Sequence, residues 1–221
     1  CTFYPAVHPH GNWGTIGAAL GVAKLRGFNQ NEIEQALYIS ASLALPSTWE
    51  SCFKGATVRN IYTGFSNCNG ILATDFVKAG AIAPSTNVEI IFGGIFSPSG
   101  FNKQRVLEGL GSVYEITRNY FKIFSCCRYN HGPLEALGLL KQEYSFQAEE
   151  IESILVETYK LAAMLDNQEP VNPFGAKFSI PFAAATYLIN GGARKEFFQW
   201  EQVEDQVVRS LARKVFVQED P

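Results

Sequence analysis

The stretch that decides the fold is Gly14-Thr15-Ile16-Gly17-Ala18-Ala19-Leu20-Gly21-Val22-Ala23, in which glycine and alanine dominate. A helix with so little side-chain bulk lets neighbouring helices approach it closely, as close packing of a protein interior requires. We therefore expect this helix to lie buried inside a bundle. Gly27 is a suitable stop signal, because glycine readily adopts the left-handed conformation that ends many helices.

Two more helices are predicted on the C-terminal side of this stretch. Asn29 followed by Glu32 three residues later resembles a capping box, which predicts a helix start. The apolar spacing that follows continues to Pro46, which cannot be accommodated in a helix interior. This helix and the small-residue helix before it are expected to form a hairpin with a short connection. A third helix is predicted from Asn60 to Lys78, ending at Gly80.

Residues 81–102 are apolar and contain several glycines and prolines. This composition predicts a buried loop passing under a lid. The Gly93-Gly94 pair suggests a phosphate-binding loop only superficially, because the Lys-Ser/Thr ending of such a loop is absent.

From about Tyr120 the pattern changes to short strands alternating with helices. Strands are predicted at Tyr120–Phe124, Ile154–Tyr159 and Val215–Val217. Helices are predicted at His131–Lys141, capped by Asn130 with Pro133 in the first turn, at Ala176–Ile189, and around Val203, Val207 and Leu211. Strands interleaved with helices indicate a small α+β layer domain. The boundary between an all-helical domain, residues 1–117, and an α+β domain, residues 118–221, is expected near residues 112–119.

The composition excludes several classes of protein. The 221 residues are 47% hydrophobic and 18% charged, which is typical of a globular chain. The net charge of -3 and the lack of a basic stripe give no support to a nucleic-acid partner. No uninterrupted apolar stretch is long enough for a membrane helix, so no membrane partner is expected.

Five cysteines occur without a C-x-x-C pair, so neither a zinc site nor a disulfide framework is expected. Reduced thiols in a cytoplasmic protein are the simplest interpretation. The chain begins with Cys1 and has no initiator Met, so we expect the natural N-terminus to be missing.

The densest polar segment is His8-Pro9-His10-Gly11-Asn12-Trp13-Gly14, which lies just before the small-residue helix. A histidine is suited to proton transfer because its pKa lies near neutrality. The alternative is a pair of histidines that cap or pack a loop.

Cationic side chains occur at three further places. Arg59 lies at a helix start and can grip a carboxylate with two hydrogen bonds, or it is a surface arginine. Lys122 lies in the predicted aromatic strand and points either to solvent or into a cleft. Lys177 and Ser179 lie at the start of a predicted helix, where Ser179 is also a suitable cap.

The segment Cys126-Cys127-Arg128-Tyr129-Asn130-His131 joins the predicted strand to a helix. Arg128, His131 and backbone N–H groups at a helix start could bind a carboxylate. A reactive thiol is a weaker alternative, because no obvious chemistry needs two adjacent cysteines. Buried packing is the structural role for both.

Taken together, four segments resemble the MmgE/PrpD family, which contains 2-methylcitrate dehydratase, cis-aconitate decarboxylase and iminodisuccinate epimerase. They are Val7–Gly14 with the following helix, Gly55–Tyr62, Phe121–His131 and Ala176–Phe182. The third resembles a Lys-x-aromatic-x-Cys-Cys-Arg-x-x-His stretch, and the fourth an Ala-Lys-Phe-Ser-hydrophobic-Pro-aromatic stretch. They occur in the family's order across nearly the whole chain.

The resemblance implies a multidomain α and α+β fold, with a helical domain that is partial here and a smaller α+β lid domain, and an active site in the cleft between them. It also implies a homodimer and a longer natural chain, whose upstream Asp-containing segment and further histidine have no counterpart here. Family enzymes act on small di- and tricarboxylates, the substrate partner implied here, without a metal or organic cofactor. By resemblance, the catalytic candidates are His8 and Lys122, and the substrate-binding candidates are Arg59, Arg128, His131, Lys177 and Ser179.

The first choice is a 2-methylcitrate dehydratase-like lyase. An iminodisuccinate epimerase-like isomerase and a catalytically incomplete or non-enzymatic helical module are the alternatives. Relatives often have Tyr where this chain has Phe182, which argues against a cis-aconitate-type decarboxylation. Several relatives have Lys at the position of Arg59, which would place the charge differently. The step shared by all branches is proton transfer next to a carboxylate, and the sequence does not identify the polycarboxylate.

Overall fold

The computed structural model describes residues 2–220, which divide into two compact units. Unit 1 extends to Glu50 and resumes from Thr57 to Arg118, and unit 2 comprises Ser51–Ala56 and the chain from Asn119 onwards. Cys1, one of the five expected thiols, lies outside the described residues. Unit 1 is helical and unit 2 combines helices with a small sheet, so the expected fold class is confirmed.

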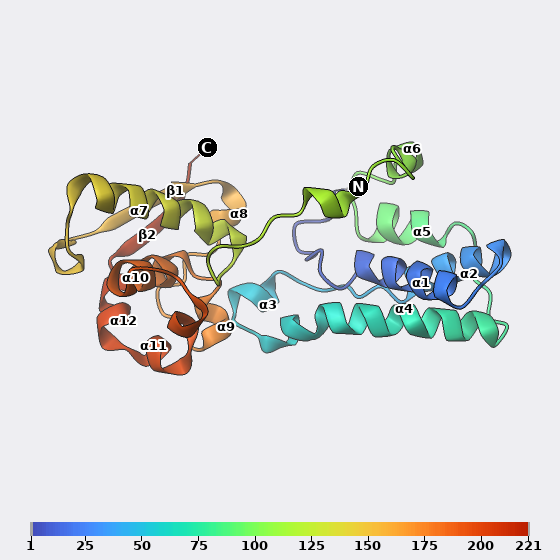
Figure 1. The fold of residues 1–221 in the computed structure, drawn as a ribbon, viewed down its shortest axis with the longest axis horizontal. Helices are drawn as coiled ribbons and strands as arrows, with labels where there is room; N and C mark the ends of the chain where they lie inside the picture. Colours follow the sequence, from blue (N-terminus) through green and yellow to red (C-terminus); the bar gives the residue numbers. More distant parts are fainter. Residues whose placement is uncertain (1, 221) are drawn as a thin grey trace. The chain divides into compact units, whose positions relative to one another are not determined.

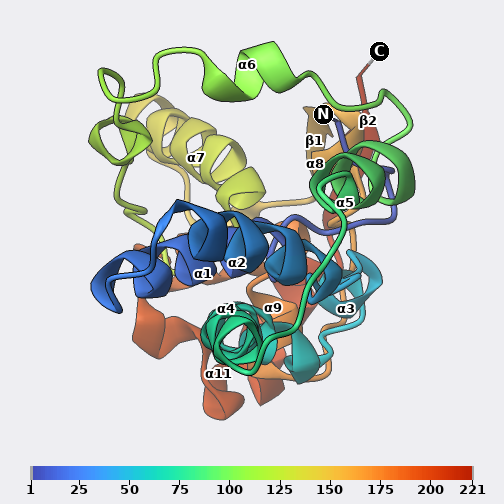
Figure 2. The same cartoon turned by 90° about the vertical axis from the view of Figure 1, so that its right-hand side faces the viewer.

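Unit 1 is built on three helices that pack against one another: α1 (Trp13–Leu25), α2 (Gln30–Ser42) and α4 (Tyr62–Lys78). All three were expected from the sequence, and Figure 1 and Figure 2 show α1 and α2 lying along one side of α4. A Cβ added to Gly70 of α4 would lie 2.5 Å from Cβ of Ala18 in α1. The small-residue helix therefore allows the close approach that its composition predicts.

The helix ends of unit 1 follow the sequence signals. Asn29 and Glu32 form the predicted capping box, since each side chain accepts a hydrogen bond from the other residue's backbone N–H. Gly27, between α1 and α2, has φ +70°, a conformation that other residues rarely adopt. The predicted third helix begins as a 3₁₀ turn, η1 (Thr57–Ile61), and continues as α4.

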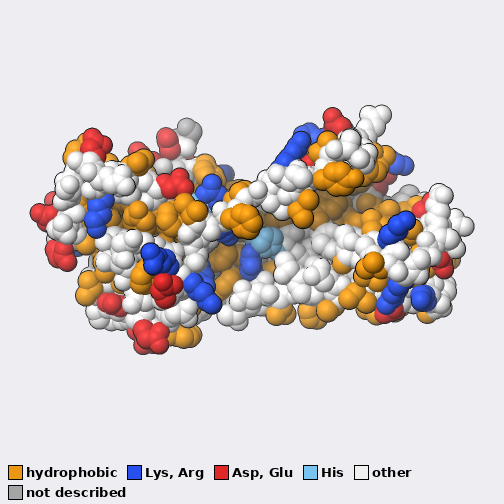
Figure 3. Space-filling model, in the orientation of Figure 1, with side chains coloured by type: hydrophobic (Ala, Val, Ile, Leu, Met, Phe, Trp, Pro, Cys, Tyr) orange, Lys and Arg blue, Asp and Glu red, His pale blue; other side chains and the backbone are white. Residues whose placement is uncertain are grey.

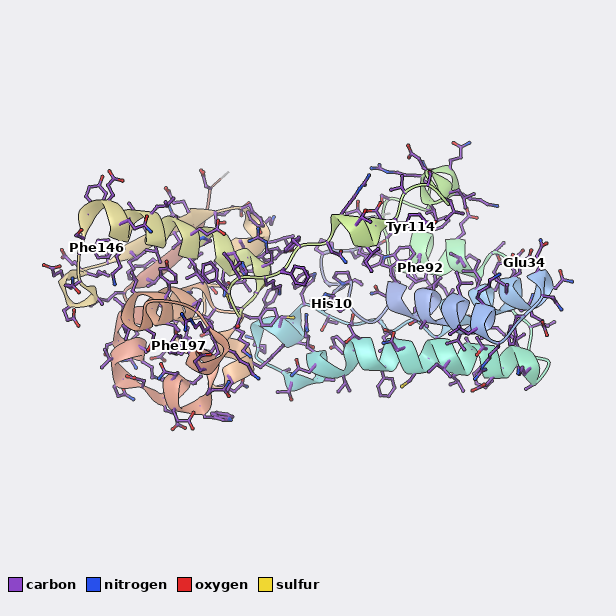
Figure 4. The ribbon with its side chains drawn as sticks, in the orientation of Figure 1. His10, Glu34, Phe92, Tyr114, Phe146 and Phe197 are labelled. Carbon is purple, nitrogen blue, oxygen red and sulfur yellow. The ribbon has the colours of Figure 1, made fainter. Side chains whose placement is uncertain are left out.

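The loop expected over residues 81–102 is wrong, because its middle is helical. It contains α5 (Asn87–Ile90) followed by one turn of π-helix, η2 (Ile91–Ile95). Phe92, labelled in Figure 4, is fully buried and packs with Phe96 and Ala41. The glycine content misled the sequence interpretation: a Cβ at Gly93 would lie 2.4 Å from Cβ of Phe101, so this glycine permits packing and does not mark a loop.

Unit 2 has a parallel two-stranded sheet and a buried central helix. Strand β1 (Ile154–Thr158) pairs with β2 (Val215–Glu219), with Ile154 opposite Val215. Both strands were predicted. The central helix α10 (Ile180–Asn190) contacts α7 (His131–Tyr144), α12 (Gln206–Ala212) and β2, as Figure 1 shows.

Three predictions for the second half of the chain need correction. Tyr120–Phe124 forms no strand, and Phe121 is 98% exposed. The single helix expected around Val203, Val207 and Leu211 is two helices, α11 (Trp200–Glu204) and α12, because Asp205 caps the second with hydrogen bonds from Val207 N and Val208 N. The helix expected from Ala176 begins only at Ile180, after a separate turn, α9 (Pro173–Ala176).

The remaining helical elements are short. They are α3 (Glu50–Phe53), α6 (Lys103–Leu107), η3 (Glu115–Arg118), η4 (Arg128–Asn130), η5 (Ala148–Glu150), α8 (Lys160–Ala163) and η6 (Lys195–Phe198). On α4, the apolar side chains Phe65, Leu72 and Phe76 reach solvent. Within residues 2–220, no helix combines the length and the apolar character needed to cross a membrane.

Candidate active site

Two of the three histidines of the chain lie together in unit 1, on the loop that leads into α1. His8 N donates to Ser47 O, and Asn12 Nδ2 donates to His8 O at 2.9 Å. Asn12 also caps α1, because its Oδ1 accepts from Trp13 N. The amide of Asn12 thus fixes the loop to the helix start, and this positions the histidine pair.

His8 is buried, with 2% of its surface exposed, and its ring lies 4.2 Å from the ring of Trp49 and 4.4 Å from that of His10. Its Nδ1 accepts a hydrogen bond of 3.0 Å from His10 N. Burial, with smaller contributions from His10 and Arg59, lowers the pKa of His8 from 6.5 to about 4. His8 is therefore a neutral imidazole at pH 7, with its proton on Nε2.

Arg59, from η1, reaches the second histidine. Its Nη2 lies 2.6 Å from His10 Nδ1. The side chain of His10 is exposed, and Figure 4 labels it on the loop before α1. Figure 3 shows histidine atoms at the surface on the face that it draws. Unit 1 thus brings His8 and Arg59, two residues singled out in the sequence, together with His10, which was not assigned a role.

Unit 2 gathers basic side chains around the two adjacent cysteines. Lys122 Nζ donates to Cys126 O at 3.3 Å, and Cys127 N donates to Lys177 O at 2.8 Å. Lys122 and Lys177 are both close enough to Cys126 to favour its thiolate electrostatically. Arg128 stacks over the ring of Tyr120 at 5.2 Å.

None of the three cations in this cluster forms an ion pair with a carboxylate of residues 2–220, where the ion pairs are Arg26–Asp75, Arg118–Glu115 and Arg213–Glu169. A cluster of positive side chains without carboxylate partners is suited to holding an anionic ligand. The structure therefore brings together Lys122, Arg128 and Lys177.

His131 begins α7 beside this cluster and packs edge-on against Phe124, with ring centroids 5.1 Å apart. Burial first, and then Arg128 and Lys122, lower its pKa. Its Nε2 is buried without a hydrogen-bond partner among the described residues. His131 is thus a neutral imidazole at pH 7, with the cations Arg128 and Lys122 as neighbours.

Ser179 and Asn130 have structural bonds. Ser179 Oγ accepts from Phe182 N at 2.8 Å and donates to Asn167 O at 2.6 Å, so it caps α10. This geometry favours the capping role over substrate binding for Ser179. Asn130 precedes α7, but its side chain makes no cap hydrogen bond there; Nδ2 donates to Lys177 O and Ser179 O instead. Asn130 is thus the N-cap residue of α7, as expected, but its side chain ties the cysteine segment to the start of α10 and makes no cap hydrogen bond.

The four described cysteines are present as thiols. Cys126 is buried, and burial raises the pKa of its thiol to about 12. This weakens the reactive-thiol alternative for Cys126, because the thiolate is the nucleophile. Over residues 2–220, no three His, Cys, Asp or Glu side chains are arranged so that they could share a metal ion.

The sequence of the chain matches two domains of one family. The MmgE/PrpD N-terminal domain matches residues 3–103, and the MmgE/PrpD C-terminal domain matches residues 124–221. Curated relatives include cis-aconitate decarboxylase of Aspergillus terreus (strain NIH 2624 / FGSC A1156), 24% identical over 92% of this chain and 45% of that protein. Cis-aconitate decarboxylase-like protein oryM of Aspergillus oryzae (strain ATCC 42149 / RIB 40) is 20% identical over 91% and 45%. The chain spans less than half the length of these relatives.

Proposed function

Because the chain belongs to the MmgE/PrpD family, we propose that the full-length protein is a lyase that acts by acid–base chemistry on a small di- or tricarboxylate. The common step is proton transfer at a carbon next to a carboxylate. This step builds negative charge on that carboxylate, so it needs nearby cations and hydrogen-bond donors. Such groups perform the step without a metal or organic cofactor.

The observation that carries this proposal is the group of cations in unit 2 that have no carboxylate partner within residues 2–220. Lys122 and Lys177 lie around Cys126, and Arg128 is near His131. Lys122 and Arg128 are exposed and Lys177 is half-buried, so an anionic ligand can reach all three cations. We assign Lys122 to stabilising the charge that develops on the reacting carboxylate, and Arg128 and Lys177 to holding the substrate.

Unit 1 contains candidate groups of its own. A guanidinium has five N–H donors in a fixed plane, and Nη2 of Arg59 lies 2.6 Å from His10 Nδ1. We assign Arg59 to gripping a substrate carboxylate. His8 is assigned to proton transfer as the base that takes up the proton leaving the carbon, because a neutral imidazole has one unprotonated ring nitrogen, here Nδ1.

Within the family, we propose dehydration of a 2-methylcitrate-like hydroxy acid. Phe182 supports this choice, because it cannot provide the phenol that relatives often have at this position. Decarboxylation of cis-aconitate is the second candidate, favoured by the names of the relatives at 24% and 20% identity. Epimerisation of an iminodisuccinate-like substrate is a third branch. A homodimer in the cytoplasm stays a prediction.

Binding of citrate to the full-length protein, measured by calorimetry, tests this proposal. Arg59→Ala and Lys122→Ala should each weaken binding about 10- to 100-fold, because each removes charge-assisted hydrogen bonds worth about 1.5–3 kcal/mol. Lys103→Ala is the matched control, since Lys103 is an exposed cation on α6. Equal affinities for all four proteins would contradict the proposal and favour a non-enzymatic module.

A further inference from the structure

We propose that His10 is a substrate-contacting residue, which donates its Nε2–H to a carboxylate oxygen of the substrate while Arg59 holds its other ring nitrogen. The inference rests on the proposed function, because it assumes a carboxylate ligand. It gives a role to His10, which lies in the segment Val7–Gly14 but has no role among those assigned above.

The contact between Arg59 and His10 determines the form of the imidazole. A guanidinium has only donors and keeps its charge at any pH at which proteins fold. At 2.6 Å from Arg59 Nη2, His10 Nδ1 must therefore be the acceptor and carry no proton. A neutral imidazole has one N–H, so the proton is on Nε2. His10 consequently presents a hydrogen-bond donor on the edge of the ring away from Arg59.

The backbone of His10 is held on both sides. Its N–H donates to Nδ1 of His8, and its carbonyl oxygen accepts from the hydroxyl of Ser47. The rings of His8 and His10 also pack in a T-shaped arrangement, with centroids 4.4 Å apart. These contacts hold the loop before α1 in place, so the orientation of His10 does not have to be established when a ligand binds.

Exposure distinguishes the two histidines. His8 is 2% exposed, whereas His10 is an exposed residue that a ligand can reach. Figure 4 marks the position of His10 in the fold. The buried ring is thus suited to supporting its neighbour, and the exposed ring is suited to touching the ligand.

The chemistry of this arrangement is that of an oxyanion donor. A hydrogen bond from a cation to Nδ1 withdraws charge from the ring and strengthens the donor at Nε2. When a proton leaves the carbon next to a carboxylate, the charge moves onto the carboxylate oxygens. Arg59 and the Nε2–H of His10 would then stabilise that charge as neighbouring donors, and no net proton transfer from His10 is required.

The first arm of the test measures the tautomer and does not depend on activity. In the full-length protein labelled with ¹⁵N, two-bond ¹H–¹⁵N correlations at pH 7 should show His10 Nδ1 unprotonated and Nε2 protonated. Arg59→Ala should remove this preference, and His10→Gln identifies the signals. Protonated Nδ1 in the wild-type protein would overturn the inference.

The second arm measures citrate affinity and turnover. His10→Ala should lower kcat/KM about 100- to 1,000-fold, as loss of one oxyanion donor does, and should weaken citrate binding. His10→Gln, which keeps an N–H donor, should recover at least 10-fold of the loss, a rescue that a purely structural role would not produce. Equal melting temperatures for the two variants establish that both are folded.

The two arms separate the failure of this inference from the failure of the proposed function. Active wild-type protein with an equally active His10→Ala variant would overturn the role of His10 and leave the lyase standing. Wild-type protein without turnover would contradict the proposed reaction. Citrate affinity then decides the inference, because unchanged binding by His10→Ala would overturn it.

Discussion

His10 N donates a 3.0 Å hydrogen bond to Nδ1 of His8, so the backbone of one histidine sets the protonation of the other. Burial, with smaller contributions from His10 and Arg59, makes the neutral form of His8 the stable one, and the bond leaves the proton of that form on Nε2. A buried imidazole that must stay neutral couples the folding of unit 1 to pH.

We expect the free energy of unfolding to fall as the pH is lowered from about 6.5 to about 4. The folded-state pKa of His8 is about 4, below the ordinary 6.5, so the unfolded chain takes up a proton first. The contribution is fully present above pH 6.5 and is lost as the pH falls. Its size is about 3 kcal/mol, at about 1.4 kcal/mol for each unit of pKa.

Urea unfolding at several pH values, for wild-type protein and His8→Gln, measures this effect. The pKa of His131 is also lowered, so its contribution has the same sign and is present in both proteins. The difference between the two curves isolates His8. Parallel curves for the two proteins would show that His8 is not held neutral by burial.

The contact between α1 and α4 predicts opposite effects for two glycines of one helix. A Cβ at Gly70 would meet Cβ of Ala18 at 2.5 Å and the backbone of Ala19 and Thr15 at 2.8 Å, whereas a Cβ at Gly64 meets nothing within 4 Å. Gly70→Ala should destabilise the protein by about 1–3 kcal/mol through overpacking. Gly64→Ala should stabilise it by up to about 1 kcal/mol, because alanine favours helices. Thermal unfolding of both variants measures the difference. If Gly70→Ala were as stable as Gly64→Ala, the packing of α1 on α4 would be contradicted.

The cysteines should differ strongly in reactivity. Cys68 is exposed on α4, whereas Cys126 is buried with its pKa raised from 9.0 to about 12, a change that reduces the thiolate fraction about 1,000-fold at pH 8. Alkylation with iodoacetamide at pH 8, followed by mass spectrometry of the peptides, should label Cys68 first and Cys126 last. Cys68→Ser is the control that removes the fast site. Rapid labelling of Cys126 in folded protein would revive the reactive-thiol alternative.

Replacing Phe182 with Tyr, the residue that relatives often have at this position, should lower the stability of the protein. The ring is fully buried and packs against Phe198, with centroids 6.3 Å apart. Phe182→Tyr should destabilise the protein by about 1–3 kcal/mol, since its hydroxyl would enter an apolar core. Phe197→Tyr is the matched control, because Phe197 is only half-buried and its hydroxyl can reach water. Chemical denaturation of both variants measures the difference, and an unchanged stability of Phe182→Tyr would mean that the core offers the hydroxyl a partner.

The helices of unit 1 could be predicted because their ends are determined by residues that lie close together in the sequence. The capping box joins Asn29 and Glu32, and Gly27 ends the preceding helix by its own conformation. The strand expected at Tyr120–Phe124 failed for the opposite reason. A strand needs a hydrogen-bonding partner, and an aromatic alternation cannot specify one. The single helix expected through Val207 failed because the cap formed by Asp205 restarts the helix and turns Val208, not Val207, inward.

The sequence indicated which basic residues are candidates for the site, but it could not predict how their side chains are arranged in space. Arg59 and the histidines are separated by about fifty residues, and only the fold brings Arg59 Nη2 to His10 Nδ1. Exposure, which distinguishes His10 from His8, is likewise set by tertiary packing against Trp49. The capping role of Ser179 was one of two alternatives in the sequence, and its bonds to Phe182 N and Asn167 O favour that role.

The most direct test of the central claim is turnover by the full-length protein in deuterated water, followed by NMR with 2-methylcitrate, citrate, cis-aconitate and iminodisuccinate. We predict loss of water from 2-methylcitrate, with His8→Ala abolishing the reaction. Loss of carbon dioxide from cis-aconitate, or deuterium incorporation with inversion of iminodisuccinate, would identify another branch of the family. No turnover and no exchange with any of the four would contradict acid–base chemistry on a small polycarboxylate.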